Sequence, residues 1–237
     1  KRTHGMSGAH LANIANEAAI LAVRNNKKNI GILEFNEAIE KVVAGLQRKN
    51  AVITEKEKRT IAYHEAGHAL MGKILNTDRV AKVSIIPRGE ALGYVIQAPE
   101  EDKYLATTEE LKNRIRVLLG GRASEQIICG EISTGARDDL KKATTIAYQM
   151  VCEYGMSRLG NRVFEPTLLS NCYEIVDAEI KRIMEECYQD SLSYIKTNIH
   201  FLSAIAHALY EKESLTADEL DNIMQNVQSK IPCHANI

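Results

Sequence analysis

Apolar residues recur at helical spacing along most of the chain and predict a mainly α protein. The first such stretch, residues 8–24, gathers leucine, isoleucine and alanine on one helical face. Ser7 stands just before this stretch and is its predicted N-cap. A second, shorter helix is expected over about 34–43. The polar segment 45–50 follows, and we place a domain boundary there.

After this boundary a long helix is expected to begin at Thr54, because Glu57 three residues later completes a capping-box pattern. Residues 80–98 then change character. Two short runs rich in β-branched residues, separated by Arg88-Gly89-Glu90, predict two strands of a small sheet. The further helices are expected at about 107–119 (interrupted there by Gly120-Gly121), 136–153, 174–196, 199–211 and 216–229. The predicted fold is therefore mainly α with one small β-sheet.

The composition places the chain among soluble globular proteins, since 45% of its 237 residues are hydrophobic and 26% are charged. The 30 Lys and Arg balance 31 Asp and Glu, and this net charge of -1 argues against nucleic-acid binding. No apolar run approaches the roughly 18 residues that span a bilayer. The five cysteines include no CxxC pair, which argues against a disulfide framework and favours a reducing compartment. Because the chain begins at Lys1, we expect it to be part of a longer protein.

The strongest chemical signal is the run HEAGH, in which His64, Glu65 and His68 lie on the long predicted helix. Residues four apart share a helix face, with Cβ atoms about 5–6 Å apart, so both imidazoles can bind one zinc ion. The glutamate can then take a proton from a water molecule that the metal has activated for attack on a carbonyl. The alternative is a pair of surface histidines on an amphipathic helix.

A zinc site of this kind requires a third ligand. The extended pattern HExxHxxGxxH fails, because Met71 and Ile74 stand where its glycine and last histidine would be. His200 and His207 are seven residues apart and are better explained as ordinary helix residues. A carboxylate is therefore the expected third ligand.

The segment TGARDDL offers two candidate carboxylates. The apolar face of the helix that follows runs through Ala143, and stepping back four residues leads to Asp139, whereas Asp138 heads the polar face. An acidic residue on a buried face is costly unless it is paired or binds a cation, so Asp139 is the better metal candidate. The alternative for Asp139 is stabilisation of the positive end of the helix dipole.

Glu125 poses a similar question, provided that the helix continues through the two glycines. It shares a helical stripe with Leu118 and Arg122. One interpretation is a carboxylate that orients a ligating histidine through its other ring nitrogen. The other is an ion pair with Arg122, three residues earlier. Both interpretations stay open at this point.

The runs IAYHEAGHAL, KVSIIPRGEALGY, LLGGRASEQI, STGARDDLKKAT and EYGMS together resemble the peptidase domain of the FtsH family of membrane-anchored AAA proteases. The upstream run GMSGAHLANIANEAAILA is similar to the helical lid of that family's ATPase module. The match covers nearly the whole chain and is looser from about residue 166 onward. The resemblance implies the end of an AAA lid at residues 1–45 and a helical, zincin-type peptidase domain with a small sheet at 51–237.

Carried onto the matching positions, the resemblance implies that His64, His68 and Asp139 bind Zn²⁺ and that Glu65 is the catalytic base. In this family substrates pair with a strand edge beside the zinc. The corresponding region here comprises Leu92, Gly93, Tyr94 and Val95.

Two positions depart from the usual family pattern. Asp138 stands where the family usually has Asn, and the Asp-Asp-Leu form is more similar to the mitochondrial matrix-facing branch. His10 stands where the lid usually has Asp, which affects its capping and any nucleotide-sensing role. The resemblance therefore implies a full-length protein anchored in the mitochondrial inner membrane, with the plastid or bacterial inner membrane as alternatives.

No GxxxxGK[ST] run occurs in the chain, so the phosphate-binding loop for ATP is not in it. ATP and Mg²⁺ are expected only in an upstream ATPase module, and this chain alone is not expected to hydrolyse ATP. The resemblance implies an ATP-dependent zinc endopeptidase that forms a homo- or hetero-hexamer and degrades unfolded or membrane proteins, without nucleic acid.

Two other hypotheses compete with this one. The domain could serve as an oligomerisation and chaperone base with a structural zinc, given the apolar faces of its C-terminal helices. A structural zinc site usually closes four protein ligands, whereas this sequence offers three and a glutamate, which disfavours that hypothesis. A metallo-hydrolase of small amides is disfavoured by the family resemblance.

Overall fold

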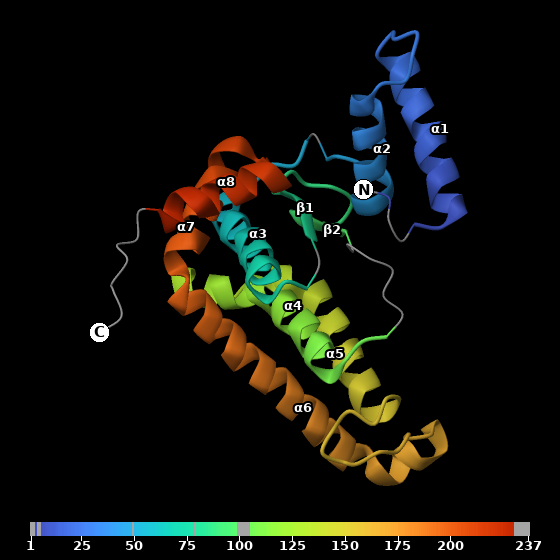
Figure 1. Cartoon of the computed structure of the whole chain (residues 1–237), viewed down its shortest axis with the longest axis vertical. Coiled ribbons are helices and arrows are strands. Elements are labelled where there is room, and N and C mark those ends of the chain that lie inside the picture. The colour runs from blue at the N-terminus through green and yellow to red at the C-terminus, as the bar shows by residue number, and fades with distance from the viewer. Residues whose placement is uncertain (1–2, 4–5, 49, 78, 99–104, 230–237) are drawn as a thin grey trace.

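Two short N-terminal helices pack against each other and project from the rest of the molecule (Figure 1). The computed structural model describes residues 3, 6–48, 50–77, 79–98 and 105–229. Helix α1 spans Gly8–Arg24 and helix α2 spans Ile32–Ala44. Ser7 caps α1 as predicted, because its side chain accepts a hydrogen bond from the backbone N–H of His10. The two helices bury a small core of their own.

Helix α3, Glu55–Leu75, runs through the centre of the molecule and carries the HEAGH run. The predicted capping box forms between Thr54 and Glu57. Helix α4, Thr108–Cys129, crosses α3 and does not stop at Gly120-Gly121, so the predicted interruption is wrong. Packing explains this continuity. A Cβ on Gly67 would lie 2.4 Å from the carbonyl oxygen of Gly120, so glycine on both helices permits a very close crossing.

A three-stranded antiparallel sheet lies beside α3, with the strand order β2-β1-β3. Strand β1 spans Arg79–Ser84 and begins one residue before the first predicted run, and β2 spans Tyr94–Ala98, within the second. The third strand, β3 at Ser214–Thr216, was not expected from the sequence. It pairs with the far side of β1, where Val83 faces Leu215. This arrangement leaves β2 as an edge strand of the described sheet.

After α4 come η1 (Thr134–Ala136), α5 (Arg137–Cys152), α6 (Pro166–Thr197), α7 (Ile199–Lys212) and α8 (Ala217–Gln228). These helices complete two hydrophobic cores, one around α3 and α7 and one between α4, α5 and α6. Helix α6 begins at Pro166, earlier than predicted, because proline is favoured in the first helical turn. Several apolar residues of the C-terminal helices, which the chaperone-base hypothesis assigns to subunit contacts, pack inside the chain, namely Ile183, Ile195, Leu202 and Ile205, whereas Ile175 is largely exposed.

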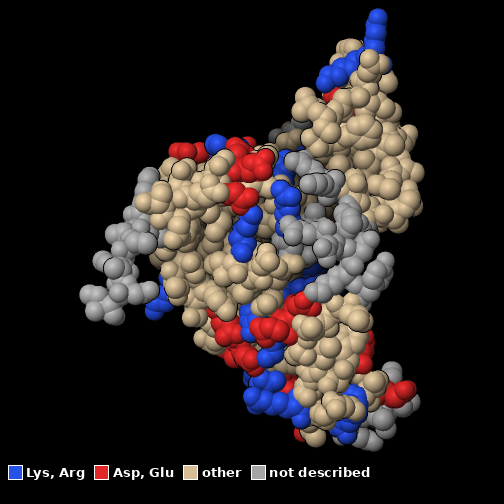
Figure 2. Space-filling view, viewed as in Figure 1, with Lys and Arg blue, Asp and Glu red and all other residues tan. Residues whose placement is uncertain are grey.

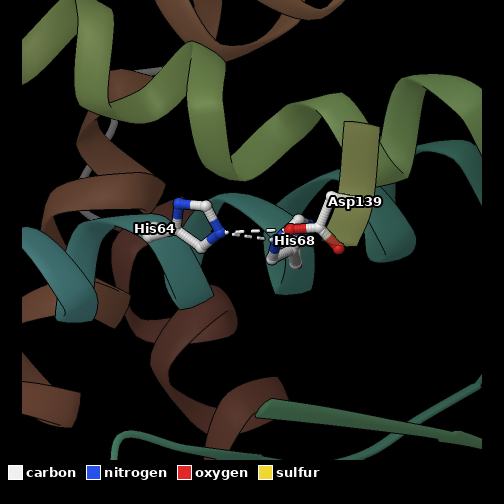
Figure 3. A group of neighbouring side chains, drawn as sticks. All are labelled: His64, His68 and Asp139. Atoms are coloured by element: carbon white, nitrogen blue, oxygen red, sulfur yellow. Dashed lines mark hydrogen bonds and ion pairs between the residues drawn. The ribbon is translucent and has the colours of Figure 1, made fainter. Parts of the chain in front are cut away.

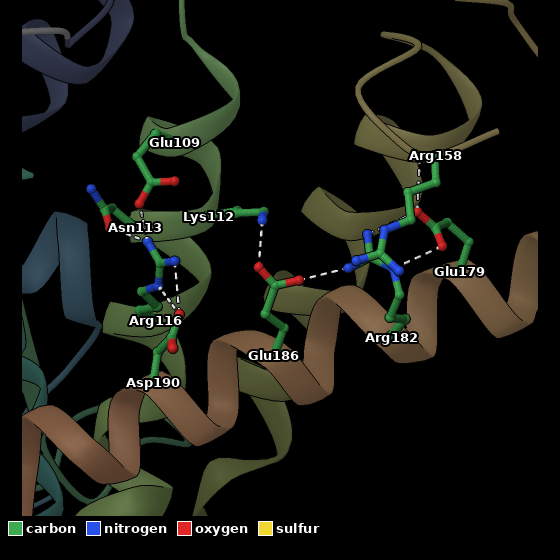
Figure 4. A network of polar contacts seen from close by, with 9 residues as sticks. All are labelled: Glu109, Lys112, Asn113, Arg116, Arg158, Glu179, Arg182, Glu186 and Asp190. Atoms are coloured by element: carbon green, nitrogen blue, oxygen red, sulfur yellow. Dashed lines mark hydrogen bonds and ion pairs between the residues drawn. The ribbon is translucent and has the colours of Figure 1, made fainter. Parts of the chain in front are cut away.

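Charged side chains of both signs intermix over α6 and its neighbours (Figure 2). The α4–α6 ion-pair network lies at the contact between these helices, where Arg116 of α4 binds Glu109 and Asp190 (Figure 4). Its other members are Lys112, Asn113, Arg158, Glu179, Arg182 and Glu186. None of the helices in the described ranges is long and apolar enough to cross a membrane.

Candidate metal centre

The two histidines of the HEAGH run lie one turn apart on α3, and both are buried. Their imidazole rings are at an angle of 77° to each other, and their Nε2 atoms are 3.1 Å apart. A helix permits this approach because its i and i+4 side chains project from the same face. The surface-histidine alternative is therefore wrong for this structure.

Asp139 reaches the same point from the first turn of α5 (Figure 3). Its Oδ2 lies 3.4 Å from Nε2 of His64 and 3.3 Å from Nε2 of His68. Asp138, one residue earlier, is exposed. The structure thus turns the two adjacent carboxylates in the directions that the helical-face argument predicts.

The donor atoms of His64, His68 and Asp139 lie within 4.8 Å of one another. Two imidazole nitrogens and one carboxylate oxygen are a donor set suited to zinc, and a set of three leaves a further coordination position open. Gly121 of α4 leaves room beside them, because a Cβ there would lie 2.6 Å from both Nε2 atoms. The residues present therefore fit a zinc ion.

Each imidazole is oriented by a contact of its other ring nitrogen, Nδ1, with a protein oxygen. Nδ1 of His64 lies 2.6 Å from Oε1 of Glu125, and Nδ1 of His68 lies 2.8 Å from the carbonyl oxygen of Val117. Because a carbonyl oxygen only accepts, Nδ1 of His68 carries the proton. Its Nε2 then presents a lone pair to the cluster.

Glu125 is buried, and both of its carboxylate oxygens have hydrogen-bond partners. Besides its contact with His64, it accepts hydrogen bonds from the backbone N–H of Ser133 at 2.6 Å and from the Ser133 hydroxyl at 3.0 Å. No ion pair between Arg122 and Glu125 is found in the part of the chain that the structure describes. The geometry favours the histidine-orienting interpretation of Glu125 over the ion pair.

The charges of the cluster favour a cation at its centre. In the metal-free chain burial opposes protonation of His64, but its hydrogen bonds with Asp139 and Glu125 raise its pKa to about 10. Burial also opposes ionisation of Asp139, yet His64 and His68 hold the pKa of its carboxyl well below the usual range. The carboxylates therefore retain a positive charge between them even without a metal.

Glu65 lies next to this cluster and is itself buried. Burial raises the pKa of its carboxyl, while the neighbouring histidines oppose that shift. The backbone at Gly93 passes directly over it, since a Cβ on Gly93 would lie 2.6 Å from Oε1 of Glu65. Of the predicted strand region, Tyr94 and Val95 lie in β2, whereas Leu92 and Gly93 form the bend that leads into it.

A cleft of about 730 Å³ is lined by residues of β2, α4 and α5, and the three candidate ligands are not part of its lining. Val117, whose carbonyl holds His68, and Asp138, next to Asp139, both contribute to its walls. Its lining also includes Gln97, Arg114, Leu118, Lys141 and Ile146. The cleft therefore borders strand β2 and the helices α4 and α5, which contribute Val117 and Asp139 to the metal centre.

Sequence reasoning missed three contributors: the Val117 carbonyl, Ser133 and Gly121. A backbone carbonyl carries no side-chain signal, and Ser133 contacts Glu125 through a loop. Gly121 did leave a signal, because a glycine pair inside a helical pattern indicates close packing. His207, set aside as a ligand, is exposed beside Glu211.

Comparison with known proteins agrees with this geometry. Residues 51–223 match the model of peptidase family M41. The chain is 59% identical over 225 residues to ATP-dependent zinc metalloprotease FtsH 2 of Thermoanaerobacter sp. (strain X514), covering 95% of this chain and 44% of that protein. It is 42% identical over 247 residues to ATP-dependent zinc metalloprotease FtsH 4 of Synechocystis sp. (strain ATCC 27184 / PCC 6803 / Kazusa), covering 96% and 39%.

A third relative is the ATP-dependent zinc metalloprotease FtsH of Thermotoga maritima, which is 44% identical over 249 residues and is covered to 41% of its length. The chain thus spans less than half the length of these relatives. The family model covers most of the chain, including all residues of the metal centre. This match confirms the family resemblance inferred from the sequence, and the chain belongs to peptidase family M41, with the FtsH zinc metalloproteases.

Proposed function

We propose that this chain is the proteolytic part of an ATP-dependent zinc endopeptidase. In this proposal His64, His68 and Asp139 hold the zinc ion and Glu65 is the catalytic base. The observation that carries the proposal is the convergence of three ligand atoms within 4.8 Å beside a buried glutamate. When bound, the zinc ion acts as a Lewis acid that polarises the peptide carbonyl and acidifies water at the site.

The side chains of the chain perform the proton transfers. Glu65 removes a proton from the attacking water molecule while the water oxygen bonds to the peptide carbonyl carbon. It then delivers that proton to the amine nitrogen as the C–N bond breaks. A raised pKa suits this double task, because a carboxyl whose pKa lies closer to neutral pH both accepts and donates a proton readily. Glu125 keeps the His64 ring in its orientation throughout.

The substrate is proposed to be an extended segment of an unfolded or membrane protein. Strand β2 is at the edge of the described sheet and begins beside Glu65. A peptide that adds to this edge forms main-chain hydrogen bonds that are independent of its sequence. The adjoining cleft, with apolar walls and basic groups such as Arg114 and Lys141, can accept a side chain of the bound peptide.

The finer expectations from the family resemblance stay proposals. They are ATP and Mg²⁺ in an upstream module, a homo- or hetero-hexameric assembly and a membrane anchor in the full-length protein. The division into residues 1–45 and 51–237 also stays a prediction. For location, the mitochondrial inner membrane is the expectation from Asp138-Asp139, whereas relatives from Thermoanaerobacter and Synechocystis support the bacterial alternative.

The decisive experiment replaces Glu65 by Gln in the full-length protein. Zinc per chain is measured by elemental mass spectrometry, and hydrolysis is measured with an unfolded, fluorescently quenched protein. We expect about one zinc per chain in both proteins and loss of cleavage in the variant only. Glu131→Gln, which alters an exposed carboxylate paired with Lys56, is the control and should keep both zinc and activity.

Two outcomes would contradict the proposal. A Glu65→Gln protein that cleaves at the parent rate would remove the glutamate from the reaction. A parent protein with full zinc but no peptidase activity would favour the non-catalytic base with a structural zinc. A panel of small amides, run alongside, separates protein cleavage from small-amide hydrolysis.

A further inference from the structure

A buried carboxylate of helix α2 binds three side chains from β1, β2 and the loop between them. Glu40 of α2 is only 6% exposed. Its Oε2 accepts hydrogen bonds from the Tyr94 hydroxyl at 2.9 Å and from Nη2 of Arg88 at 3.0 Å, and Lys82 pairs with its Oε1. Arg88 also contacts Glu37, one turn earlier on α2. We call these five residues the Glu40 clasp.

Backbone contacts reinforce the clasp. The N–H of Gly89 donates to the carbonyl of Leu46 at 3.0 Å, and the N–H of Arg48 donates to the carbonyl of Pro87 at 2.9 Å. The segment after α2 therefore runs along the loop between β1 and β2. Figure 1 shows α2 next to this side of the sheet. The N-terminal helices are thus joined to the sheet by side chains and by backbone.

The chemistry of the clasp is better suited to fixing the position of α2 relative to the sheet than to stabilising the fold. Burying an ion pair is expensive, and an apolar contact of similar volume often stabilises a protein as well or better. Hydrogen-bonded charges, by contrast, fix distances and directions. Burial and the adjacent Glu40 raise the pKa of Tyr94 to about 12, so its hydroxyl remains a donor at neutral pH.

Tyr94 connects the clasp to the proposed active site. It is the first residue of β2, and it directly follows Gly93, whose backbone lies against Glu65. The hydroxyl of Tyr94 is fixed to α2, while its main chain begins the edge on which substrate is proposed to lie. One hydrogen bond and one peptide link therefore connect Glu40 through Tyr94 to Gly93, and the Gly93 backbone packs against Glu65.

We propose that Tyr94 is a positioning residue for peptide hydrolysis, through which α2 holds the start of β2 beside Glu65. This inference rests on the proposed function. It makes the N-terminal helices part of the machinery that receives an extended substrate, since a shift of α2 moves the strand edge relative to the catalytic base. Tyr94 itself does not touch the reacting atoms in this scheme.

The test compares Tyr94→Phe with the parent in the full-length protein, using two substrates. One is a long unfolded protein that can pair along β2, and the other is a blocked tetrapeptide too short to do so. Loss of a hydrogen bond to a charged group is expected to raise KM for the long substrate by about tenfold. KM for the tetrapeptide, kcat and zinc content should change far less.

The matched control is Tyr210→Phe, because the Tyr210 hydroxyl also contacts a glutamate, Glu55, but on an exposed surface. It should behave as the parent with both substrates. Glu40→Gln, which keeps an acceptor oxygen but removes the charge, provides an independent variant. Combined with Tyr94→Phe, it should raise KM by less than the sum of the two separate effects, because both changes remove the Tyr94–Glu40 contact, although Glu40→Gln also weakens the contacts with Arg88 and Lys82.

A Tyr94→Phe protein with the parent KM for the long substrate overturns the inference, as does an equal loss with both substrates. So does a strictly additive effect of Glu40→Gln. These results differ from failure of the proposed function, which is judged by the peptidase activity of the parent and of Glu65→Gln. If Glu65→Gln abolishes cleavage while Tyr94→Phe leaves both substrates unaffected, only the positioning role fails.

Discussion

The metal centre and the α4–α6 ion-pair network both bring ionisable groups together where helices meet, but they arrange them in opposite ways. In the network each positive group faces a carboxylate: Arg116 pairs with Glu109 and Asp190, and Lys112 pairs with Glu186 (Figure 4). In the metal centre, His64, His68 and Asp139 direct three ligand atoms to one point (Figure 3). Paired charges hold helices together, whereas converging ligand atoms require a cation.

The carboxylates that hold the key side chain of each region also differ in their exposure to solvent. The carboxylates that bind Arg116 are substantially exposed, so solvent can replace them. Glu125, behind the metal centre, is 1% exposed and satisfied by protein groups. Loss of a partner should therefore cost little in the network and much in the centre.

Replacement of Asp139 by Ala should give the largest effect, because it removes a proposed ligand and leaves the charge of the cluster unbalanced. We expect loss of zinc and a fall in peptidase activity of at least 100-fold. Elemental analysis and a cleavage assay measure the two effects. Asp138→Ala serves as control, and near-stoichiometric zinc in Asp139→Ala would move the third ligand elsewhere, with Glu125 the first candidate.

Replacement of Glu125 by Gln should rank second. The carboxylate orients His64 without being a proposed ligand, so we expect zinc affinity to fall by about 10–100-fold while the fold is retained. A competition titration with a zinc chelator measures this change. Glu131→Gln, at an exposed glutamate paired with Lys56, is the control. Equal zinc affinities in the two variants would show that Glu125 has no orienting role.

The pH dependence of the metal-free chain offers a third test. The folded pKa of His64, about 10, lies above its ordinary value of 6.5. Its contribution to stability is therefore complete below about pH 6.5 and is lost as the pH rises through 10. Urea unfolding of the metal-free protein should show the free energy of unfolding falling over this interval. Asp139→Asn should flatten that slope, and an unchanged slope would exclude His64 as its source.

The smallest effect is expected in the network. Asp190→Asn removes one of the two carboxylates on Arg116 and should lower the free energy of unfolding by only about 0.5–1 kcal/mol. Zinc content and peptidase activity should not change. Urea unfolding measures the first, and elemental analysis with the cleavage assay measures the others. A large loss of zinc in this variant would mean that the two regions are coupled.

Local patterns predicted most of the fold and the heart of the candidate site. Spacing of four residues placed His64 and His68 on one face, and the same helical geometry selected Asp139 over Asp138. Capping patterns located helix starts at Ser7 and Thr54. Each of these inferences needs only the geometry of a single helix.

Features that depend on contacts between distant segments were not predictable in this way. Strand β3 has three residues and exists because β1 offers it an edge. Gly120-Gly121 was interpreted as a helix break, yet in the structure it allows α3 and α4 to cross closely. The Glu40 clasp joins residues 42 to 54 positions apart, and no local sequence pattern predicts such a pairing.

The position of β3 also determines the order in which the molecule can be completed during synthesis. Strands β1 and β2 are made before β3 and can pair as a hairpin, but the other edge of β1 stays unpaired until Ser214–Thr216 is made, after helices α4, α5, α6 and α7. Pairing across so long a stretch of chain is a late event in folding. A ribosome-bound chain would thus carry its HEAGH helix well before its finished sheet, and the strand edge proposed for substrate would gain its final support only after these helices have been synthesised.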